Sequence, residues 1–153
     1  MTTQLRNIGA LITVMRASAN VAATAGGAGD NTEVIGAILD RAEIGMPQSC
    51  VFAVPFSATL GDGETLSIAC TLESGNGSDL SDAADLHVVA STVVATGPAG
   101  GGTVTGTYEV MAPIMGAGRY LRAKFTPDLS AGATDTAALS SVVVFGGADR
   151  LPA

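Results

Sequence analysis

The stretch Ser49–Glu73, with the sequence SCVFAVPFSATLGDGETLSIACTLE, decides the fold class. Its second half, Glu64–Glu73, alternates apolar and polar or small residues, as a strand with one buried face does. The apolar members are Leu66, Ile68, Cys70 and Leu72. Its first half, Ser49–Ala58, is a more continuous apolar strand, and Pro55 within it predicts a sheet edge or a bulge because proline lacks the ladder donor. The glycine turn Gly61–Gly63 predicts that the two strands form a hairpin.

Further short strands are predicted on both sides of this stretch. Their ranges are Ala10–Met15, Val34–Leu39, Leu86–Ala95, Thr103–Met111, Arg119–Phe125 and Ala137–Phe145. Loops rich in Gly, Pro, Asn and Asp separate them, and no long stretch has the period of a helix. About eight short strands with this spacing predict an all-β sandwich or barrel.

The composition limits the classes of function. Of the 153 residues, 47% are hydrophobic and 14% are charged, which is too apolar for a disordered chain. The sequence contains no run of about 18 apolar residues, so no membrane-spanning helix is predicted. Seven basic and 14 acidic residues give a net charge of −7, which opposes binding to nucleic-acid phosphates. Outward strand positions hold Thr, Ser and Ala, which favours a surface that lies against another protein over the alternative of a compositional bias in the genome.

The length fits one folded domain with less regular ends. The predicted parts are an N-terminal strand or arm over 1–31, a β-sandwich domain over 32–147 and a C-terminal tail over 148–153. Residues 17–31 are small and have no period, which predicts a flexible arm or loop. A signal peptide is imitated by the apolar run Ile8–Met15 and the small residues Ala23–Ala25. The apolar run is short, however, and ends at Arg16, so we expect a first strand or arm over Ala10–Met15.

Few residues have the chemistry of an active site. His87 is the single histidine, so zinc lacks a second imidazole and a Ser-His-Asp triad has no supporting motif. The glycine run 97–102 has neither the basic residue nor the helix of a phosphate loop. Asp79, Asp82 and Asp85 are a candidate calcium cluster, but their spacing misses the EF-hand pattern. The sequence therefore predicts a protein that is not an enzyme and has no cofactor or metal.

The two cysteines, Cys50 and Cys70, both lie in apolar or alternating strands. A thiol in such surroundings acts as a small hydrophobic group and is chemically inert. Whether the two residues pair in a disulfide is left open by the sequence.

Four of the seven basic residues lie in the last third of the chain. They are Arg119, Arg122, Lys124 and Arg150. Arg122 and Lys124 alternate with apolar residues, so they project together from one face of a sheet. These four residues are candidate contacts with an acidic partner surface, a capsid among them, or between subunits of a homo-oligomer, and a solvated face is the alternative.

Three segments of the chain resemble capsid cement (decoration) proteins of tailed bacteriophages, in particular the small jelly-roll kind. The segments are Val51–Leu72, Gly118–Pro127 and Val142–Pro152. The resemblance covers roughly residues 34–153. It implies a jelly-roll-like antiparallel β-sandwich of about eight strands with a flexible N-terminal arm. An immunoglobulin-like sandwich is the alternative, since strand count alone does not separate the two folds.

The resemblance also implies a function. Proteins of this kind are made in the bacterial host cytoplasm, lie on the outer surface of the virion capsid, bind the phage major capsid protein and stabilise contacts between its subunits, often as homotrimers. An acidic protein suits the outside of a capsid better than its DNA-facing side, and neither nucleic acid nor membrane is an expected partner. The alternative is a phage head or tail spike that binds a host-surface glycan, which predicts exposed aromatic residues in loops. A β-sandwich enzyme is disfavoured by the single histidine.

Overall fold

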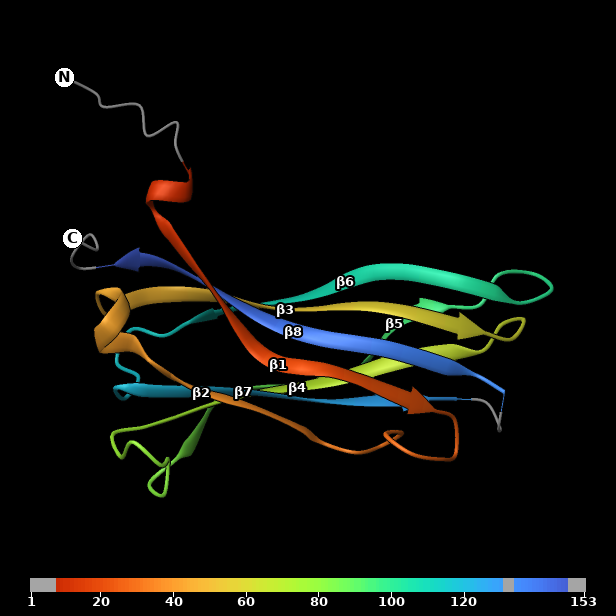
Figure 1. Ribbon diagram of the computed structural model, residues 1–153, viewed down its shortest axis with the longest axis horizontal. Coiled ribbons are helices and arrows are strands. Elements are labelled where there is room, and N and C mark those ends of the chain that lie inside the picture. Colours follow the sequence, from red (N-terminus) through yellow and green to blue (C-terminus); the bar gives the residue numbers. More distant parts are fainter. Residues whose placement is uncertain (1–7, 131–133, 149–153) are drawn as a thin grey trace.

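Two four-stranded antiparallel sheets make up the protein (Figure 1). The computed structural model describes residues 8–130 and 134–148. Sheet A contains, in spatial order, β1 (Ile12–Thr24), β8 (Thr136–Ala148), β3 (Pro47–Leu60) and β6 (Gly102–Pro113). Sheet B contains β2 (Val34–Asp40), β7 (Tyr120–Leu129), β4 (Thr65–Gly75) and β5 (Ala84–Thr96). Two short 3-10 helices are η1 (Ile8–Ala10) and η2 (Arg41–Ile44). Within the described ranges, none of the helices is long and apolar enough to cross a bilayer.

The strand order is that of a jelly roll. The antiparallel pairs are β4–β5, β3–β6, β2–β7 and β1–β8, so each strand of the first half pairs with its counterpart in the second half. This is the pairing of one long hairpin that is folded around a core. The predicted eight-stranded jelly-roll sandwich is therefore confirmed. The immunoglobulin alternative is wrong, because that fold would place the first strand in one sheet with the second, fourth and fifth.

The strands β3 and β4 do not pair with each other. β3 lies between β8 and β6 in sheet A, whereas β4 lies between β7 and β5 in sheet B, and the turn at Gly61–Gly63 carries the chain across the core. The predicted hairpin is therefore wrong. The alternation of β4 and the apolar run of β3 show that both strands are buried, but strands that are neighbours in one sheet and strands that face each other across a core both have such patterns.

Pro55 lies in a central strand whose two ladders keep their register, so the predicted sheet edge or bulge at this residue is wrong. It pairs with Thr107 on β6, while the ladder between β3 and β8 has no paired residue between Ala53 and Phe56. This gap accommodates the missing N–H of proline without ending the strand.

The first strand belongs to the sandwich. β1 pairs with β8 from Ile12 to Thr24, so the first strand predicted near Ala10–Met15 is present, and the flexible arm or loop predicted from residue 17 is wrong as far as Thr24. Ala17, Ala23 and Ala25 are almost fully buried, and their small side chains let the strand pack closely on the core. The predicted C-terminal tail lies outside the described residues, apart from Ala148, which ends β8.

Aromatic and branched side chains from both sheets fill the space between them. The largest fully buried apolar residues are Phe52, Phe125, Phe145, Leu60, Leu66, Ile68, Ile114 and Leu121. Cys50 and Cys70 are buried, free thiols on opposite sheets. Burial raises the pKa of Cys50 to about 11 and that of Cys70 to about 12, so both remain protonated and act as packing groups.

Candidate interaction surfaces

The acidic residues of the β4–β5 loop hold the loop backbone. The Asp82 carboxylate accepts hydrogen bonds from the backbone N–H groups of Asn76 at 2.8 Å and Gly77 at 2.9 Å. Asp79 accepts one from the backbone N–H of Ser81 at 3.1 Å and one from its hydroxyl at 2.9 Å. These bonds lower the pKa of both carboxyl groups. In the part of the chain that the structure describes, no group of three or more His, Cys, Asp or Glu side chains is arranged to hold a metal ion.

Two of the four predicted basic residues, Arg122 and Lys124, lie on the outer face of sheet B, where an acid of the same chain pairs with them. Lys124 Nζ lies 2.9 Å from Glu73 Oε2, and Arg122 binds the other oxygen of the same carboxylate. Arg119, just before β7, forms an ion pair of 2.6 Å with Asp40. Their role as contact residues stays a prediction, and Arg150 lies outside the described residues.

The Glu73 carboxylate is the centre of this charged face. Its side chain is only 7% exposed, and desolvation raises its pKa. Hydrogen bonds from Lys124 and Arg122, together with their positive charges, outweigh desolvation and lower the pKa below its ordinary value of 4.5. A carboxyl group whose pKa is lower in the folded state stabilises the fold above its unfolded pKa, and that contribution is lost as pH falls through the folded pKa.

We expect Glu73→Gln to lower the free energy of unfolding by about 2 kcal/mol at pH 7, because Arg122 and Lys124 lose the buried carboxylate that they share. The variant should also lose stability less steeply than the wild type as pH falls below about 4.5. Urea unfolding at pH 7 and pH 3 measures both effects. Glu33→Gln is the matched control, because Glu33 is 48% exposed and lies 3.8 Å from Lys124. Equal acid sensitivity in Glu73→Gln and the wild type would contradict the expectation.

The outer face of sheet A is apolar near the end of the sandwich where β1 begins. Across its four strands the register places Val14, Val144, Val51 and Met111 in one row. The ends of the row are open to solvent, since Val14 is 59% exposed and Met111 is 78% exposed. A shallow hollow of about 420 Å³ lies beside this row, lined by residues that include Ile12 and Pro113.

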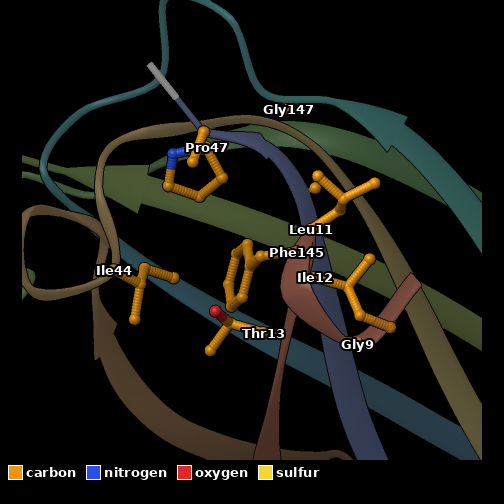
Figure 2. A pocket seen from close by; sticks show the side chains of 10 residues that line it. Gly9, Leu11, Ile12, Thr13, Ile44, Pro47, Phe145 and Gly147 are labelled. Atoms are coloured by element: carbon orange, nitrogen blue, oxygen red, sulfur yellow. The ribbon is translucent and has the colours of Figure 1, made fainter. Parts of the chain in front are cut away.

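The same end of the sandwich exposes further large apolar side chains, and we call it the apolar end. Ile8 and Met115 are 71% and 76% exposed, and Met46 is 37% exposed. Both described chain ends lie there (Figure 1). A hollow of about 560 Å³ lies at this end. Figure 2 shows the Phe145 ring in it, among Pro47, Ile44, Thr13, Leu11 and Ile12.

A buried arginine holds the loops of the apolar end. Arg41 follows β2 and is 1% exposed. Its guanidinium donates to the carbonyl oxygens of Ala117 at 2.5 Å and Gly118 at 2.9 Å in the β6–β7 loop, and to that of Pro47 at 2.8 Å at the start of β3. Nothing in the sequence around Arg41 distinguishes it from a surface arginine, so the sequence does not predict its burial.

Comparison with known proteins gives likeness of structure alone. No protein-family model matches the chain, and no curated protein matches it. Among solved structures, it is similar to a chain of infectious bursal disease virus, Gx strain, at 13% identity and a TM-score of 0.48 over 92% of this chain. It is similar to the infectious bursal virus derived T=1 particles at 11% identity and a TM-score of 0.49 over 92% of this chain, and to dimeric latent PorU from Porphyromonas gingivalis at 11% and 0.41 over 89%. The chain spans 33%, 32% and 12% of the length of these three chains, respectively.

Proposed function

We propose that this chain is a structural virion protein without enzymatic activity, which binds the outside of a bacteriophage capsid and stabilises contacts between major capsid protein subunits. The observation that carries the proposal is the apolar end, where Ile8, Met46 and Met115 are exposed beside a hollow. Large apolar side chains gathered on one part of a surface mark a site of contact with another macromolecule.

Two features of the sequence support a capsid as that macromolecule. The segments that resemble phage cement proteins lie mainly in β3, β4, β7 and β8, the strands at the centres of the two sheets. The net charge of −7 suits the outer surface of a head better than its DNA-facing surface. Because Arg119, Arg122 and Lys124 have acidic partners within the chain, we assign the capsid contact to the apolar end.

The capsid contact is tested on heads of the phage that encodes the chain, stripped of this protein. We expect the wild-type protein to rebind these heads and to restore their resistance to heat and osmotic shock. We expect Met46→Glu/Met115→Glu to bind at least about tenfold more weakly, because each change places a charge in an apolar contact.

The matched control is Val88→Glu/Val93→Glu, which makes the same kind of change at two residues on β5 that are 60% and 55% exposed. It should bind like the wild type. Failure of the wild-type protein to bind stripped heads would overturn the proposed function. Heads that stay intact without the protein but no longer adsorb to host cells would favour the host-binding alternative instead.

A further inference from the structure

The two sheets differ in charge. The four strands of sheet A contain two charged residues, Arg16 on β1 and Glu109 on β6. The strands of sheet B contain Asp40, Glu73, Asp85, Arg122, Lys124 and Asp128. Among the described side chains, no ion pair includes Arg16 or Glu109, whereas Arg122 and Lys124 on sheet B are both paired. An almost uncharged outer sheet face is unusual for a surface in water.

The two charges of sheet A lie at opposite ends of one row. The register pairs Arg16 with Val142, Val142 with Ala53, and Ala53 with Glu109. Since β1 and β6 are the edge strands, the row begins with a cation at one edge and ends with an anion at the other. Three strand spacings, roughly 14 Å in all, separate the two residues within one copy, so they do not pair there.

We propose that the outer face of sheet A binds a second copy of the chain, related by a two-fold axis that runs along the strands between the two faces. This rotation exchanges the edges of the sheet and lays β1 over the other copy's β6. Arg16 of each copy then faces Glu109 of the other, and Val14 faces Met111. A two-fold interface must be complementary to itself, and these rows satisfy that condition in both charge and size. Stacked sheets lie about 10 Å apart, a gap that an arginine and a glutamate span together.

The other in-plane two-fold axis runs across the strands and fits less well. With the axis on the row of Val14 and Met111, it would place Arg16 over Ile12 of the second copy and Glu109 over Pro113. Both charges would then be desolvated against apolar groups without a partner, which costs free energy. Charge complementarity therefore selects the axis along the strands.

The same face continues beyond these rows as small side chains. Ala22, Ala138, Ser57 and Thr105 form one row, and Thr24, Thr136, Thr59 and Thr103 form the next. Such a flat surface lets two sheets approach along their whole length, rotated by the roughly 30° that stacked sheets adopt. Because the axis runs along the strands, the apolar ends of both copies point the same way. The dimer proposal does not rest on the proposed function. If both hold, the dimer presents two apolar ends to the capsid, and once one end is bound the other is held at a high effective concentration.

Sedimentation equilibrium of the purified chain, at concentrations up to roughly millimolar, tests the proposal in solution without any capsid. We expect a monomer–dimer equilibrium in the wild type. Arg16→Glu and Glu109→Arg should each weaken the dimer at least about tenfold, because each creates like-charge pairs across the axis. The double variant Arg16→Glu/Glu109→Arg should return to within about threefold of the wild type, because it restores both pairs.

A second pair of variants separates the face from a general effect of added charge. Val14→Glu should abolish dimerisation, whereas Val88→Glu on sheet B should leave it unchanged, and the two valines are 59% and 60% exposed. A strict monomer, a trimer as the cement-protein resemblance implies, or a double variant that is as weak as the single variants would each overturn the proposal. Failure of capsid binding with an intact dimer would overturn the proposed function alone.

Discussion

Replacement of Arg41 by methionine is expected to lower the free energy of unfolding by about 3–5 kcal/mol. Methionine retains much of the apolar stem, but it leaves the carbonyl oxygens of Ala117, Gly118 and Pro47 without the guanidinium that they bind. These carbonyl groups belong to the β6–β7 loop and to the start of β3, which are far apart in sequence. Loss of the shared donor therefore removes hydrogen bonds that hold these two segments together at the apolar end. Urea unfolding followed by far-UV circular dichroism, at a dilute protein concentration, measures the change.

The matched control is Arg119→Met in the same region. Arg119 is 52% exposed and its ion pair with Asp40 lies at the surface, so we expect a much smaller loss than in Arg41→Met. Losses of similar size in the two variants would show that Arg41 contributes no more than a surface ion pair.

Gly97→Ala is expected to destabilise the fold by about 2–4 kcal/mol, because a Cβ at this position would overlap the carbonyl oxygen of Gly61. Gly97 is buried in the β5–β6 connection, which packs against the turn between β3 and β4. Its N–H donates to the Glu64 carbonyl at 2.7 Å, and its own carbonyl accepts from the Gly63 N–H at 3.2 Å. The β3–β4 and β5–β6 connections, both of which pass between the sheets, thus lie in direct backbone contact, and neither can move without losing these hydrogen bonds.

Gly146→Ala serves as the control for the loss of glycine itself. A Cβ there meets only the Ser49 hydroxyl at 3.7 Å, which is ordinary contact, so we expect a change within about 0.5 kcal/mol. Thermal and urea unfolding of both variants give the comparison. A tolerated Gly97→Ala would mean that the two connections separate easily.

Where the sequence alternates cleanly, it predicted which face of the strand is buried. Leu121, Ala123 and Phe125 are in the core while Arg122 and Lys124 lie outside, as alternation requires. The prediction of a flexible arm failed because a run of small side chains was interpreted as a flexible segment. The small residues of β1 resembled a loop, yet Ala17 and Ala23 are buried where the edge strand packs against the core.

The candidate sites were less predictable than the strands. The basic residues of β7 were found by alternation, but their acidic partners were not, because Glu73 is 49 residues away from Arg122. Arg41 gave no signal, since its partners are backbone carbonyl groups, which every sequence contains. The opposite charges of Arg16 and Glu109 are related only through the strand register, which places the two residues in one row across the sheet.

The sequence by itself determined an all-β sandwich or barrel of about eight short strands, and the inward face of those strands that alternate cleanly. These properties follow from a period of two residues and from turn composition, which are local along the chain. The tertiary structure alone decided that β3 and β4 belong to different sheets, that β1 completes sheet A, and that one outer face carries charge while the other carries almost none. Those properties depend on which distant strands pair and in what register, and alternation leaves both undetermined.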